Sequence, residues 1–311
     1  MRSMFLTVAL AGAMSLLGAM GALGQEATPE AANLFADLGL PELTITATEA
    51  GLAVDQPEVA SGRYLVNLVD ETGNPDLATG LVRLDEGETL EDLSYADEVA
   101  AGTPAPGDEG EPPIETYQFL FDNHIAGGPS AASPHVVVDL PAGEYGVWPD
   151  DPFAETPVAP LTVTGDPDEP VSGPELEAAA TIIEEGVGGE GFTFRVDGAL
   201  RAGPQIVEVV NASDQPHFVI AMQYPEPITM DQVMGAFMFD PSSGATPGPD
   251  MLDFEQISWV GYAAVQSAGT TQWVTMDLAA GQAILVCFIP DPEAGGVPHA
   301  FEGMIQLVDV A

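Results

Sequence analysis

Short apolar runs, separated by glycine, proline and acidic residues, recur along most of the chain. They are rich in β-branched residues and bounded by turn-forming residues, which is typical of β-strands. We predict strands at residues 64–69, 136–140, 206–210, 272–276 and 283–289. Many short strands without long alternating helices indicate an all-β protein built from antiparallel β-sandwiches.

Helix signals are few and short. Thr229 and Gln232 form a capping-box pattern. The apolar residues after Thr229 recur at helical spacing and share one face: Met230, Val233, Met234, Phe237 and Met238. We expect this helix to pack on a sandwich, with the methionines filling gaps. Residues 29–38 and 175–185 are further candidates for short accessory helices.

Segments repeat at a spacing of roughly 140 residues, which indicates an internal duplication. Residues 62–70 parallel residues 203–211, and residues 138–144 parallel residues 276–282. The order is the same in both copies. A segment rich in proline, glycine and acids lies between them, as is typical of a linker. We predict Greek-key β-sandwich domains at 25–165 and 175–311, joined by linker 166–174, and expect each to fold independently.

The N-terminus has the features of a secretory signal peptide, predicted at residues 1–24. Arg2 supplies a positive charge, residues 4–17 form an apolar run, and residues 22–24 are small. The apolar run is too short for a good membrane anchor, and no later segment is apolar enough to span a membrane. We therefore expect a secreted or periplasmic protein.

The charge balance is strongly acidic. The chain has 49 Asp and Glu residues against 5 Lys and Arg residues, and all five of these are arginines. The formal net charge of −44 would become −45 on removal of residues 1–24, which contain Arg2 and no acid. Such a surface repels nucleic acid and fits a cationic protein or redox partner. A solvated acidic surface suited to a salty medium is the simpler explanation, and we prefer it.

The chain contains 1 Cys, so no intramolecular disulfide can form. In an oxidising compartment a lone thiol is tolerated when it is buried or bound to metal. Cys287 lies in a run that is apolar on both faces and is therefore predicted to be buried. It is either a small hydrophobic residue or a metal ligand. His217, Cys287, His299 and Met304, in that order, have the residue types of a type 1 copper site.

Residues 175–311 resemble the cupredoxins, and most closely the plastocyanins. The resemblance lies in the segment from Asn211 to His217 and in the closing segment from Cys287 through His299 and Met304. It implies a Greek-key sandwich with one copper ion, held by His217, Cys287 and His299 with Met304 as axial ligand. Eleven residues separate Cys287 from His299, more than is usual in this family. The longer loop costs only about 1 kcal/mol in closure entropy.

The first copy lacks the corresponding ligands. A shift of about 140 residues places Leu77 near His217 and Pro149 opposite Cys287, so we expect no copper in residues 25–165. The remaining histidines, His124 and His135, are better explained by packing than by catalysis.

We expect an electron carrier or a binding protein and not an enzyme. The chain has only 4 histidines, no His-X-His pair and no common hydrolase motif. A metal-free binding or structural module and a copper-carrying protein remain alternatives.

Overall fold

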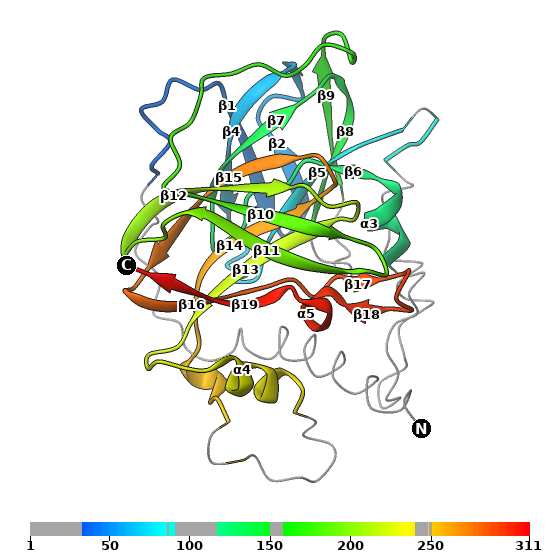
Figure 1. The fold of residues 1–311 in the computed structure, drawn as a ribbon. Helices are drawn as coiled ribbons and strands as arrows, with labels where there is room; N and C mark the ends of the chain where they lie inside the picture. The colour runs from blue at the N-terminus through cyan, green and yellow to red at the C-terminus, as the bar shows by residue number, and fades with distance from the viewer. Residues whose placement is uncertain (1–32, 86, 91–116, 150–157, 240–247, 249–250) are drawn as a thin grey trace.

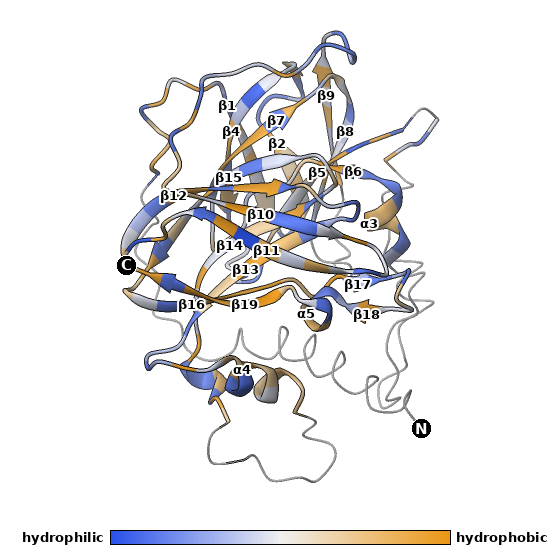
Figure 2. Cartoon of the chain, in the orientation of Figure 1, coloured by the Kyte–Doolittle hydropathy of each residue, from blue (hydrophilic) through white to orange (hydrophobic). Residues whose placement is uncertain are grey.

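The computed structural model describes residues 33–85, 87–90, 117–149, 158–239, 248 and 251–311 (Figure 1). The predicted signal peptide, residues 1–24, lies outside these residues. The described chain is mostly β-strand with a few short helices, so the predicted all-β class is confirmed. Hydrophobic and hydrophilic segments alternate along the strands (Figure 2).

The largest sheet has eight strands in the order β11-β10-β12-β15-β7-β4-β1-β2. Its strands come from both predicted repeats. They are β1 (Glu42–Thr48), β2 (Gly51–Val54), β4 (Gly62–Asp70), β7 (His135–Leu140), β10 (Ala180–Val187), β11 (Gly191–Gly198), β12 (Gly203–Asn211) and β15 (Thr271–Leu278).

Two smaller sheets each belong to one half of the chain. In the first half the order is β3-β9-β8-β5-β6, with β3 (Glu58–Ala60), β5 (Thr79–Arg83), β6 (His124–Ile125), β8 (Gly143–Pro149) and β9 (Ala159–Thr164). In the second half the order is β14-β13-β16-β19, with β13 (His217–Gln223), β14 (Ser258–Gln266), β16 (Gly281–Val286) and β19 (Ile305–Val310). A two-stranded hairpin pairs β17 (Pro290–Asp291) with β18 (Val297–Pro298).

The two halves meet within the large sheet. Strand β7 of the first half pairs antiparallel with β15 of the second, and Val136, Val137 and Val138 at this junction are fully buried. The Ser267 amide also donates to the Ile125 carbonyl, and the Arg63 guanidinium lies over the Trp273 ring. The expectation that each half folds independently is therefore revised, because separating them would expose a buried strand edge. The division into two Greek-key domains stays a prediction.

The main apolar core also includes residues from both halves. It contains Leu81 and Val82 of β5 as well as Val219 and Ala221 of β13. Cys287 and Met304 belong to the same cluster and are fully buried. The copper-ligand candidates therefore lie in the interior and not in a surface loop.

The predicted capping box is present at α4 (Met230–Phe237), where the Thr229 hydroxyl accepts from the Gln232 backbone amide. Val233 and Phe237 are buried against a second apolar cluster, whereas Met238 is 60% exposed. The apolar face is thus narrower than predicted. The other described helices are α3 (Gln118–Asp122), α5 (His299–Glu302) and the 3-10 turn η3 (Phe254–Gln256).

The helix predicted at residues 175–185 is wrong. Strand β10 begins at Ala180 and pairs in parallel with β12. Burial alternates along it, with Ile182 and Glu184 inside, which is the two-residue period of a strand. For the predicted helix at 29–38, only residues 33–38 are described, and they form a turn. The five predicted strands are all present, although β16 ends at Val286, immediately before Cys287. Among the described residues, no helix has the length and apolarity needed to cross a membrane.

Candidate metal centre

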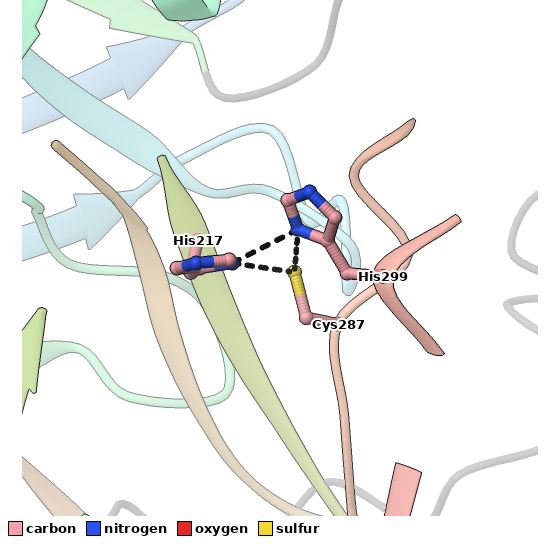
Figure 3. A group of neighbouring side chains, drawn as sticks. All are labelled: His217, Cys287 and His299. Carbon is pink, nitrogen blue, oxygen red and sulfur yellow. Dashed lines mark hydrogen bonds between the residues drawn. The ribbon is translucent and has the colours of Figure 1, made fainter. Parts of the chain in front are cut away.

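Three elements bring His217, Cys287 and His299 together (Figure 3). His217 is the first residue of β13, and Cys287 follows the last residue of β16, the strand that pairs with β13. His299 is the first residue of α5, and its backbone amide donates to the Ile289 carbonyl. Two paired strands and one short helix therefore fix the three side chains at one end of the four-stranded sheet.

The three donor atoms form a compact triangle. The Cys287 Sγ lies 3.8 Å from the Nδ1 atom of His217 and 3.8 Å from that of His299. The two Nδ1 atoms are 2.9 Å apart. Bonds of about 2.0 Å to nitrogen and about 2.3 Å to sulfur would separate S and N by about 3.7 Å around a trigonal ion. The two sulfur–nitrogen distances match this value, and the nitrogen–nitrogen distance is shorter than a symmetric trigonal site would give.

The site is shielded from solvent. His217, Cys287, His299 and Met304 are all fully buried. The Phe192 ring, from β11, lies 4.9 Å from the His217 ring and 4.2 Å from the His299 ring, centroid to centroid. Phe192 thus covers both imidazoles with apolar surface.

Burial keeps all three donors in their neutral forms when no metal is bound. It lowers the pKa of His217 well below the usual value, with the neighbouring His299 adding to the effect. It lowers the pKa of His299 to about 3, against a smaller opposing influence of Asp291. Burial also raises the pKa of the Cys287 thiol strongly, while the backbone amides of Phe218 and Ile289 oppose that shift. A metal ion that binds here must displace the thiol proton.

The Met304 backbone is hydrogen-bonded to Cys287 and to His299. Its carbonyl accepts from the Cys287 amide at 3.0 Å, and its amide donates to the His299 carbonyl at 2.8 Å. Gly303, at φ 127°, allows this turn, because a Cβ at this position would come within 2.3 Å of the Phe192 carbonyl oxygen. Met304 is therefore held next to both ligand segments. Its role as axial ligand stays a prediction.

The eleven-residue loop between Cys287 and His299 is ordered by its own hairpin. Strands β17 and β18 pair Pro290 with Pro298 and Asp291 with Val297. The hairpin returns the chain to His299 directly beside the segment that left Cys287. The long loop is therefore compatible with a converged donor set.

Polar residues around the site were not identified from the sequence. The Nε2 atom of His299 lies 3.0 Å from Oε1 of Gln215, whose Nε2 donates to Oδ1 of Asp291 at 2.8 Å. The Nε2 atom of His217 has no hydrogen-bond partner. By sequence Gln215 and Asp291 are polar residues of loops, and their one signal is proximity to His217 and to the Pro290–Pro292 turn.

A buried carboxyl group lies near the same end of the second half. Glu184 is fully buried, and its Oε2 accepts from the Gln266 amide at 2.9 Å. Burial raises its pKa to about 8, with the Gln266 hydrogen bond opposing. Its charge would raise the pKa of Cys287 further.

The remaining histidines lie away from the triangle, in the first half. His135 Nδ1 lies 2.8 Å from Oδ1 of Asn67, and burial lowers the pKa of His124. Among the described residues, one group of three potential metal-binding side chains converges, and it consists of His217, Cys287 and His299.

No protein-family model and no curated protein matches the chain. Solved structures similar to it include reduced auracyanin from Roseiflexus castenholzii, at 18% identity over 43% of this chain and 99% of that chain, with a TM-score of 0.27. The copper nitrite reductase from Nitrosomonas europaea matches at 12% identity over 87% and 93% of the two chains, with a TM-score of 0.23. A multicopper oxidase matches at 12% identity over 87% and 88%, with a TM-score of 0.23.

Two of these proteins are enzymes by name. The expectation that this chain is not an enzyme is therefore contradicted, and we do not maintain it. At such low TM-scores the matches assign no activity or substrate to this chain. The case for the metal rests on the donors themselves: two imidazoles and one thiol, converged and buried, fit one type 1 copper ion.

Proposed function

We propose that the second half of the chain binds one copper ion and serves in single-electron transfer. The observation that carries the proposal is the convergence of Cys287 Sγ with the Nδ1 atoms of His217 and His299 in a fully buried site. His217, Cys287 and His299 would hold the ion, and Met304 would be the weak axial ligand. Copper, when bound, supplies one-electron exchange between its two common oxidation states.

The protein's contribution is a rigid and dry pocket. Two paired strands fix His217 and Cys287, and the α5 turn fixes His299, so the donors need little movement when the charge of the site changes. Phe192 excludes water from the imidazole faces. The backbone amides of Phe218 and Ile289 point at the sulfur and stabilise the thiolate. Low reorganisation of this kind favours electron transfer.

We further propose that residues 25–165 and 175–311 are two copies of one Greek-key unit, joined at 166–174. The matching strand order of the two halves supports this duplication. The predicted signal at residues 1–24 supports an extracytoplasmic location, and the charge of −44 favours a cationic redox partner.

The test is to add copper(II) to the metal-free full chain and record the visible spectrum. We expect one equivalent to produce an intense thiolate-to-copper charge-transfer band. Ascorbate should bleach the band, and an oxidant should restore it. A protein that stays colourless while its Cys287 thiol remains open to alkylation under denaturing conditions would refute the copper assignment. So would a band that ascorbate does not bleach.

A further inference from the structure

A chain of three buried side chains leads away from the metal centre. His299 Nε2 lies 3.0 Å from Gln215 Oε1, and Gln215 Nε2 lies 2.8 Å from Asp291 Oδ1. All three residues are buried. These hydrogen-bonded side chains connect α5, the loop before β13 and the β17–β18 hairpin.

Asp291 determines which way round the Gln215 amide lies. An ionised carboxylate only accepts hydrogen bonds, so the Gln215 amide must present its NH2 group to Asp291. The amide oxygen is then left facing His299. Because this oxygen can only accept, His299 must carry its proton on Nε2. Its Nδ1 is then unprotonated and lies on the side of Cys287 and His217.

The carboxylate itself is held firmly. Asp291 Oδ2 accepts from the Gly189 backbone amide at 2.7 Å, and Oδ1 accepts from the Glu293 amide at 2.7 Å. The Gln215 side-chain amide packs against Gly188. A Cβ atom at Gly188 would lie only 2.3 Å from Gln215 Nε2. The arrangement thus leaves neither Gln215 nor Asp291 much freedom to turn.

We propose that Gln215 and Asp291 are positioning residues that hold His299 in the tautomer whose Nδ1 carries no proton. The inference rests on the proposed function, because it takes Nδ1 as the copper-binding atom. It also gives the long Cys287–His299 loop a purpose, since that loop supplies Asp291. In the metal-free protein the 2.9 Å contact between the two Nδ1 atoms needs one proton. His217 must then carry that proton on its Nδ1.

The test is nitrogen-15 NMR of the metal-free full chain, which distinguishes the tautomers of each histidine. We expect His299 as the Nε2–H form and His217 as the Nδ1–H form in the wild type. Asp291→Asn replaces the acceptor-only group with an amide that can also donate, so the Gln215 amide can turn over. Gln215→Met keeps the length and removes both hydrogen bonds. Both variants should show a mixture of His299 tautomers.

Gln223→Met is the matched control. Gln223 is also a buried glutamine of the second half, but it bonds to the backbone of Ala279 and Gln282 at the far end of β13. This variant should keep the wild-type tautomers. Copper(II) affinity should fall about 10- to 100-fold in Asp291→Asn and Gln215→Met, and should not change in the control.

A wild-type His299 that carries its proton on Nδ1 would overturn the proposal without any variant. Unchanged tautomers in two folded variants, as judged by circular dichroism, would overturn it as well. The tautomer measurement needs no copper. A chain with the expected tautomers that fails to take up copper would therefore refute the proposed function and leave the positioning role supported.

Discussion

The two halves of the molecule repeat one strand order but differ completely at the position of the metal centre. Half of the large sheet has the order β2-β1-β4-β7, and the other half has β11-β10-β12-β15. Apart from β3, the smaller sheet of the first half has the order β9-β8-β5-β6, which corresponds strand for strand to β19-β16-β13-β14 in the second half. Each half also contains one parallel pair at the corresponding place in the large sheet. This pair is β1 with β4 in the first half and β10 with β12 in the second.

Strand register shows what stands in place of the ligands in the first half. Gly143 pairs with Val163 as Gly281 pairs with Val310, so Pro149 occupies the position of Cys287. Gly80 pairs with Trp148 as Ile220 pairs with Val286, so Leu77 occupies the position of His217. A leucine and a proline offer no metal donor.

The closing segments differ as well. Residues 288–304 separate Cys287 from β19, whereas the corresponding segment before β9, residues 150–158, is about half as long. The longer segment carries His299, Met304 and Asp291. A similar strand scaffold therefore does not itself create a metal centre. At this site the halves differ in the residues at two positions at or next to strand ends, Leu77 against His217 and Pro149 against Cys287, and in the length of the closing segment.

Replacing Cys287 should have the largest effect on this contrast. Cys287→Ser should abolish the charge-transfer band completely, because the thiolate is its source. The matched control is Pro149→Ser at the equivalent position of the first half, which should leave copper stoichiometry unchanged. The measurement is bound copper and visible absorbance per chain. A band that survives Cys287→Ser would place the chromophore elsewhere.

Cutting the chain between the halves tests how far they are separate units. A protease site introduced at residues 166–174 should allow cleavage, after which the two pieces should still co-elute in gel filtration. Residues 25–165 expressed alone should lose cooperative unfolding, because β7 would expose the edge that β15 covers. Two folded pieces that separate after cleavage would show independent domains.

The buried Glu184 should make the free energy of unfolding of the second half depend on pH. Its folded pKa of about 8 lies above the ordinary value of 4.5, so the folded state binds more protons between these values. Stability from this group is therefore lost as pH rises through that range, on the order of several kcal/mol in total. Glu184→Gln should be more stable than the metal-free wild type at about pH 8.5 and similar to it below about pH 4.5.

Urea unfolding at the two pH values measures this difference, with the exposed Glu190→Gln as control. Equal stability of Glu184→Gln and wild type at high pH would show that the Glu184 charge is compensated in the fold.

The strands and the ligand types could be predicted from sequence because both are local. The apolar run of β4, the alternating burial of β12 and the Thr229 capping box all depend on neighbouring residues. The segment 175–185 misled because its Ala, Ile and Glu composition suits a helix, while pairing with β12 decides for a strand. Tertiary pairing overrides local preference in such cases.

Long-range contacts could not be predicted. The β7–β15 junction joins residues far apart in the chain, and neither segment contains a local pattern that identifies the other as its pairing strand. Gln215 and Asp291 are 76 residues apart and become a pair only through the loop hairpin. A polar residue near a turn normally faces solvent, so their burial had no local signal.

The smallest expected effect concerns the acidic surface shared by both halves. Salt shortens the screening length from about 10 Å at 0.1 M to about 3 Å at 1 M, which should relieve repulsion among the acids. The described ion pairs, Arg63 with Asp139 and Arg195 with Glu185 and Asp197, are few enough that little attraction is lost in return. The melting temperature of the metal-free protein should rise steadily with NaCl. A flat or falling value in the presence of a chelator would contradict this.

Anomalous diffraction at the copper absorption edge, from crystals of the copper-loaded full chain, tests the contrast between the halves most directly. We predict a single peak per chain, enclosed by Cys287 Sγ and the Nδ1 atoms of His217 and His299, and no peak near Leu77 and Pro149. A peak in the first half, or no peak at the triangle in copper-loaded crystals, would contradict the assignment of one copper site to the second half.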